Sequence, residues 1–209
     1  LIVQHSDILN PSDQLSMSLW LKIDQFSNTW SPILQKGLPF ESAGKNREYA
    51  LWANSAGYLA LLSAGNGQKQ AAHKLNISTG EWFHYGASLN RKEKKASFYL
   101  NGKFIHTQYD PYSNFNNGKG NLTIGSCPSI SQFKTVSNFR GTIDDLKLYD
   151  VALSHADFDA IYNEPVDANF TKKIEVKNDI PKEDDTTKED EVVVKDSLDF
   201  KVTHKDGVI

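Results

Sequence analysis

Residues 15–23 alternate between large apolar and mostly polar side chains over nine positions. The odd positions are Leu15, Met17, Leu19, Leu21 and Ile23, and the even positions are Ser16, Ser18, Trp20 and Lys22. Successive side chains of a strand point to opposite faces of a sheet, so an alternation of this length predicts a strand with one buried face.

Short runs of the same kind, separated by turn residues, recur to about residue 150. Further strands are expected at 48–53, 57–63, 82–89, 96–100, 103–108, 122–125 and 142–149. Asn101-Gly102 joins two of them, and Asn-Gly between apolar runs is the strongest short hairpin signal because a type I′ turn needs positive φ at both central residues. The spacing predicts an all-β fold with two packed sheets.

One helix is expected after the last of these strands. Ser154 is a good N-cap, and Asp157 follows three residues later in a near capping box. Leu153 and Phe158 occupy the hydrophobic staple positions, and Pro165 ends the helix. The buried stripe comprises Phe158, Ile161 and Tyr162.

The composition changes after Pro165. Residues 172–191 hold eight acids, five lysines and no aromatic residue, which is typical of a linker. We therefore expect one domain over 1–164 and an acidic, polar linker over 165–191. Residues 192–209 are strand-like again, either as the start of a further domain or as a strand added to the first.

Charge and cysteine content exclude several classes of protein. The net charge is −3 and no basic patch stands out, so nucleic acid is not an expected partner. Cys127 is the single cysteine, so no intrachain disulfide can form. No apolar run reaches the roughly 20 residues that a membrane span needs.

The stretch 139–154, Phe-Arg-Gly-Thr-Ile-Asp-Asp-Leu-Lys-Leu-Tyr-Asp-Val-Ala-Leu-Ser, resembles the closing strand and short helix of laminin-G-like, pentraxin-like and other concanavalin A-type jelly rolls. Segments 5–11, 18–22, 33–37, 80–84 and 99–103 resemble earlier parts of the same family in the same order. The resemblance covers about residues 1–164. It implies a two-sheet antiparallel jelly-roll sandwich with one short helix near its end, trimmed by one strand at the N-terminus.

Members of this family are commonly extracellular, and they bind glycans or proteins or act as spacers beside catalytic domains. Our leading hypothesis is a non-catalytic carbohydrate-binding or adhesive module of an exported multidomain protein, secreted or at the cell surface. Its partners would be a glycan or a cell-surface protein and neighbouring domains of the same polypeptide. The alternatives are a protein-interaction or spacer domain of a surface adhesin and, third, a jelly-roll glycoside hydrolase or polysaccharide lyase.

Catalytic signatures are missing from the sequence. Jelly-roll hydrolases carry acids at alternate strand positions, whereas Asp144 and Asp145 are adjacent and should face opposite ways. No Gly-x-Ser-x-Gly elbow occurs, and Cys127 precedes a proline with no evident histidine partner. We therefore expect no enzyme, although the domain suits an accessory module of a carbohydrate-active enzyme.

Aromatic rings outside the expected core are candidates for stacking on sugars, whose apolar faces suit flat rings. Trp52 has opposite parity to its apolar neighbours in 48–53, which predicts an isolated ring on one sheet face. Trp20 and Trp82 match core positions of the family. The expected ligand-binding residues are Trp52, Trp30, Tyr109, Tyr112, Asn114 and Phe115, with the alternative that these rings plug the edges of the sandwich.

Asp144 shares parity with Leu146 and Leu148, so its carboxylate is expected to point inward. An inward carboxylate needs hydrogen bonds, from backbone N–H groups or His84, or a cation such as Ca²⁺. No cofactor is required, but the resemblance allows a structural calcium ion near Asp7, Asp13 or Asp144. Segment 127–134 lacks the acids with which pentraxin-type relatives bind their ligand-bridging calcium.

Overall fold

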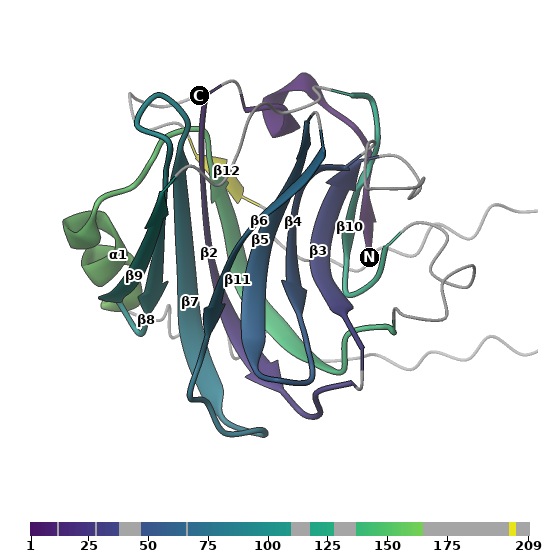
Figure 1. Ribbon diagram of the computed structural model, residues 1–209, viewed down its shortest axis with the longest axis vertical. Helices are drawn as coiled ribbons and strands as arrows, with labels where there is room; N and C mark the ends of the chain where they lie inside the picture. Colours follow the sequence, from purple (N-terminus) through teal and green to yellow (C-terminus); the bar gives the residue numbers. More distant parts are fainter. Residues whose placement is uncertain are drawn as a thin grey trace, which may run out of the picture.

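The computed structural model describes residues 1–11, 13–27, 29–37, 47–65, 67–109, 118–127, 137–164 and 201–203. Two six-stranded sheets pack face to face (Figure 1). Sheet A comprises, in spatial order, β1 (Ile2–Val3), β10 (Leu122–Ile124), β3 (Ser31–Gly37), β4 (Arg47–Ala53), β5 (Tyr58–Gly65) and β6 (Gly67–Lys74). Sheet B comprises β12 (Lys201–Thr203), β11 (Gly141–Tyr149), β2 (Gln14–Ile23), β7 (Trp82–Asn90), β8 (Lys95–Leu100) and β9 (Lys103–Tyr109).

These sheets confirm the predicted jelly-roll sandwich. Every pairing is antiparallel except that of β11 with β12. The alternating residues of β2 occupy the core as predicted, because the five odd positions from 15 to 23 are at most 3% exposed. Across the sandwich, Tyr49 and Leu51 of β4 belong to the same cluster as Tyr85 of β7.

The hairpin between β8 and β9 turns at the predicted dipeptide. Asn101 has a φ of 49° and Gly102 a φ of 75°, so both central residues are in the left-handed region. The side chain of Asn101 also accepts a hydrogen bond from the backbone N–H of His84 at 2.9 Å, which ties the turn to β7.

Helix α1 (His155–Tyr162) lies against the outer face of sheet B, beside β8 and β9 in Figure 1. The predicted capping box is present, with the Ser154 side chain accepting from the N–H of Asp157. Phe158 is fully buried, and its ring stacks on Tyr99 of β8 at a centroid distance of 4.1 Å. A Cβ at Gly86 of β7 would lie 2.5 Å from the Phe158 ring, so the close approach of helix and strand requires glycine there.

The short strand β12 pairs in parallel with the edge strand β11, with Leu148 opposite Val202. In the structure these three residues of the segment 192–209 pair with β11, and the assignment of the whole segment to this domain or to a further one stays a prediction. The linker predicted for 165–191 lies outside the described residues and stays a prediction.

Among the described residues, no helix is long and apolar enough to cross a bilayer.

Candidate functional site

Sheet B presents an outer face that α1 covers only in part. The side chain of Trp82, at the start of β7, is on this face, and the residue is 45% exposed. Trp82 pairs across the sheet with Lys22 of β2, whose ammonium lies 5.7 Å from the centre of the indole ring. Strand β8 ends at Leu100, opposite Tyr85, so it does not extend alongside Trp82. One side of the indole therefore meets a cation while much of the ring remains open to solvent.

Trp20, Tyr162 and His84 form a ring cluster next to Trp82. Trp20 pairs with His84 across the sheet, and their ring centroids are 5.5 Å apart. Tyr162, the last residue of α1, lies 5.6 Å from Trp20 and 5.8 Å from His84. Trp20 and Tyr162 are both half-buried. The C-terminal end of α1 thus continues the aromatic surface that starts at Trp82.

His84 is the buried polar centre of this cluster. Its Nε2 lies 2.8 Å from the hydroxyl of Ser18. Burial lowers the pKa of His84 to about 4, with Lys147 acting in the same direction and Glu164 in the opposite one. A serine hydroxyl beside a neutral imidazole is also the arrangement of a nucleophile and its base. However, Ser18 and His84 are at most 1% exposed, so no substrate reaches this pair in the structure. The hydrogen bond between Ser18 and His84 therefore serves to fix the imidazole within the ring cluster.

Strand β11 supplies polar groups beside the rings. Thr142 pairs with Lys22, and Asp144 pairs with Trp20, so both lie on the outer face next to the aromatic surface. Both are exposed. Lys147 lies further along and is bound by Asp145 at 3.0 Å and by Glu164 at 2.7 Å.

The prediction that Asp144 points inward is wrong. A β-bulge between Asp144 and Lys147 places two residues opposite the single Leu19, and Asp145 takes a φ of 46°. The extra residue restores Leu146 and Leu148 to the core but leaves Asp144 outside. Its carboxylate accepts a hydrogen bond from the N–H of Asp145 at 2.8 Å.

The buried acid of the described structure is instead Glu48, which is 1% exposed. Lys36 provides its counter-charge at 3.1 Å and also donates to the carbonyl of Gly120. The Lys36 ammonium lies 3.2 Å from Nδ1 of His5 as well. Burial raises the pKa of Glu48, and Lys36 opposes that effect. The charge of this buried carboxylate is therefore balanced by an ammonium from the neighbouring strand.

The candidate calcium ligands do not come together. The Asp7 side chain is fully exposed and lies 3.6 Å from Nε2 of His5, and the carboxylate of Asp13 lies 3.4 Å from the ammonium of Lys92. Within the described ranges, no group of three or more His, Cys, Asp or Glu side chains could hold a metal ion.

Trp52 lies on the predicted outer face of sheet A but is only 4% exposed. It packs with Ala50, Ala60 and Cys127, and the half-buried Trp30 packs against the same cluster. Both rings are packing elements in this structure, and a role in binding stays a prediction for them.

Of the remaining predicted ligand residues, Tyr109 ends β9 and is 72% exposed. Tyr112, Asn114 and Phe115 lie outside the described residues.

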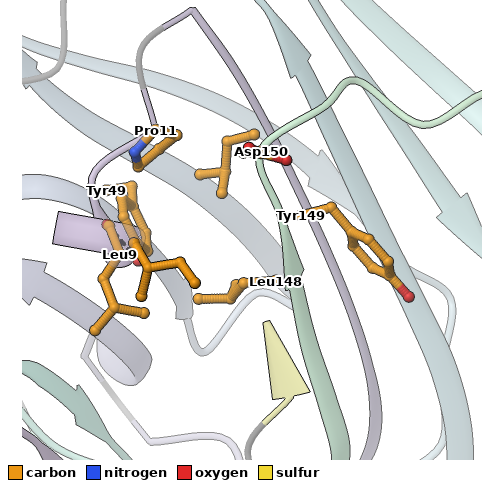
Figure 2. Close-up of a pocket in the computed structure, with 8 residues that line it drawn as sticks. Leu9, Pro11, Tyr49, Leu148, Tyr149 and Asp150 are labelled. Carbon is orange, nitrogen blue, oxygen red and sulfur yellow. Dashed lines mark hydrogen bonds between the residues drawn. The ribbon is translucent and has the colours of Figure 1, made fainter. Parts of the chain in front are cut away.

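A shallow depression lies at one end of the sandwich, between the 3-10 helix Asp7–Leu9 and strands β2, β4 and β11. Figure 2 shows Leu9, Tyr49 and Leu148 close together there, with the ring of Tyr149 turned away. The free space is about 10 Å³, which is enough for about one water molecule. It is too small for a sugar.

Sequence reasoning missed Trp82 because family resemblance assigned it to the core. The alternation of side chains along this strand does contain a signal. Trp82 faces the same side of the sheet as His84 and Gly86, and the large apolar residues Phe83 and Tyr85 face the core on the other side.

Comparisons with known proteins agree with this architecture. The laminin G-type family model described as "Concanavalin A-like lectin/glucanases superfamily" matches residues 2–158. A search of curated proteins finds no significant match.

Solved structures share the fold at low sequence identity. The heptameric SAP-like pentraxin of Limulus polyphemus superposes with a TM-score of 0.53 and 18% identity, over 73% of this chain and 71% of that one. The CBM40 module of the Ruminococcus gnavus IT-sialidase, bound to α2,3-sialyllactose, superposes with a TM-score of 0.60 and 13% sequence identity, over 76% of this chain and 91% of that one. Domain 4 of AbnA, a GH43 extracellular arabinanase from Geobacillus stearothermophilus, was solved with arabinotriose. It superposes with a TM-score of 0.56 and 20% sequence identity, over 74% of this chain and 69% of that one.

Proposed function

The chain belongs to the concanavalin A-like lectin/glucanase superfamily, and from this premise we propose that it is a non-catalytic carbohydrate-binding module that takes its glycan on the exposed ring of Trp82. The observation that carries the proposal is a 45% exposed indole on an open part of a sheet face, with the ammonium of Lys22 on one side and further rings next to it. The apolar face of a sugar suits this ring. Lys22 can donate to the hydroxyl groups and Asp144 can accept from them.

Two comparisons support a glycan as the ligand. The CBM40 module and the arabinanase domain are parts of larger carbohydrate-active enzymes, and both were solved with an oligosaccharide. The same likeness supports an extracellular setting, secreted or at the cell surface, beside other domains of the same polypeptide. Adhesion through a cell-surface protein is the alternative within this proposal.

Catalysis is disfavoured by the geometry of the described acids. Asp144 directly precedes the bulge and Asp145 lies within it, so the two acids are not at alternate positions of one strand face. Asp145 is bound to Lys147, and the buried Glu48 is bound to Lys36. We therefore propose binding without bond cleavage.

The test is a glycan panel that includes sialyllactose, arabinotriose and soluble polysaccharides, followed by calorimetry with the best binder. We expect Trp82→Ala to lower affinity at least tenfold while the melting temperature stays unchanged, because the ring is exposed. Phe104→Ala is the matched control, since Phe104 is a half-exposed ring on the edge strand β9 of the same sheet. Absence of binding across the panel, or equal loss in both variants, would overturn the proposal. Strong binding to a protein with all glycans inert would favour the adhesin alternative.

A further inference from the structure

Building on the proposed function, we infer that the ligand is a linear oligosaccharide of at least two or three sugar residues, bound along a row of rings formed by Trp82, Trp20 and Tyr162. A site for one terminal sugar would need one ring and a closed set of polar partners around it. The outer face of sheet B instead offers rings in sequence along an open surface.

The register of the sheet fixes the first step of the row. Trp82 pairs with Lys22, so it lies diagonally opposite Trp20, two residues earlier in β2. Diagonal neighbours in an antiparallel pair are roughly 7–8 Å apart, within reach of aromatic side chains. Both side chains stand on the outer face, because Leu19 and Leu21 on either side of Trp20 are buried in the core.

The second step is the contact between Trp20 and Tyr162. Their ring centroids are 5.6 Å apart and the ring planes are tilted by 30° to each other, so the two rings are direct neighbours. Tyr162 is half-buried, so part of its ring is open to solvent next to Trp20.

Two rings of the row, Trp20 and Tyr162, are held in place from beneath. His84 contacts both Trp20 and Tyr162 and is fixed by its bond to Ser18. Tyr162 also lies on Gly102, where a Cβ would come within 2.9 Å of the tyrosine Cβ. Rings that are already ordered cost little further entropy when a ligand binds, so these two rings are preorganised.

Polar groups follow the row on its β11 side. Thr142 is level with Lys22, and Asp144 is level with Trp20. Within the described residues the carboxylate of Asp144 accepts only the N–H of Asp145, which leaves acceptor capacity for sugar hydroxyls. Beyond Asp144, Lys147 is already bound by Asp145 and Glu164, so the polar edge available to a ligand ends there.

The experiment compares sugars of increasing length on the wild-type protein: arabinose, arabinobiose and arabinotriose, and in parallel galactose, lactose and sialyllactose. We expect affinity to rise at least tenfold from the monosaccharide to the trisaccharide of the series that binds. In ¹H–¹⁵N spectra the indole N–H of Trp82 should shift with every sugar of that series, whereas that of Trp20 should shift only with the longer ones.

Tyr162→Ala should reduce the affinity for the trisaccharide several-fold and leave that for the monosaccharide unchanged, with Phe104→Ala as control. If Tyr162→Ala unfolds the helix, the wild-type length dependence and the Trp20 signal still decide the matter. Equal affinity for one and three sugar residues, with Trp82 still required, would overturn the row and leave the proposed function standing. If none of these sugars and no glycan of the panel binds, both fail.

Discussion

Replacing Gly86 by alanine tests how closely α1 is seated on sheet B. The new Cβ would lie 2.5 Å from both Cδ1 and Cε1 of Phe158. Carbon atoms in contact prefer about 3.5–4.0 Å, so the ring must retreat by roughly 1 Å or more. Phe158 is fully buried and stacked on Tyr99, so it has no free space to retreat into without moving the helix.

Overpacking of this kind costs about 1–3 kcal/mol in a well-packed core. We expect Gly86→Ala to lower the free energy of unfolding by that amount, measured by urea denaturation with an unchanged dependence on denaturant. Displacement of α1 also moves Tyr162 away from Trp20, so the affinity for a trisaccharide should fall while that for a monosaccharide holds.

The matched control is the same substitution in a Phe158→Leu background. A leucine leaves room for the new methyl group, so the additional cost of Gly86→Ala should fall below about 1 kcal/mol there, although Phe158→Leu is itself destabilising. If Gly86→Ala costs the same in both backgrounds, or costs nothing in the wild type, the close seating of the helix is refuted.

Two further predictions concern buried side chains. The pKa of His84 is about 4 in the folded protein and about 6.5 in the unfolded chain, so the unfolded chain binds more protons between these pH values. The free energy of unfolding should therefore fall by roughly 3 kcal/mol as the pH drops from 6.5 to 4. In urea denaturation at several pH values, the free energy of unfolding of His84→Gln should change less with pH than that of the wild type. An identical pH dependence in both proteins would contradict the lowered pKa of His84. Trp52→Ala should cost about 3–5 kcal/mol because it empties a buried site. A wild-type unfolding midpoint for this variant would mean that the ring is available to a ligand after all.

The elements that the sequence predicts well are those fixed by neighbours along the chain. Alternation over residues 15–23 identifies β2. Asn101-Gly102 identifies the hairpin between β8 and β9, because the turn needs two residues that tolerate positive φ. Ser154 and Asp157 identify the start of α1 because the capping box is complete within four residues. Each of these signals is local, so no tertiary contact can easily override it.

The candidate site depends on contacts between distant segments, and here the sequence misleads. Parity places both Trp52 and Trp82 on outer faces, but it does not say what covers them. Cys127 and Trp30 pack against Trp52, whereas among the described residues Trp82 meets the ammonium of Lys22 and stays 45% exposed. The predicted orientation of Asp144 is wrong for a related reason. One extra residue in the bulge moves every earlier side chain of the strand to the opposite face, and the residue type at position 145 does not indicate a bulge.

The position of α1 explains why the open part of sheet B lies where it does. Phe158 needs a strand residue without a side chain, and Gly86 provides one in the middle of β7. From that anchor the helix reaches Tyr162 after one more turn, at the level of Trp20 and His84. Strand β7 begins two residues before His84, so Trp82 lies just past the end of the helix and stays uncovered. The helix that buries one half of this face therefore also sets the length of the aromatic row on the other half.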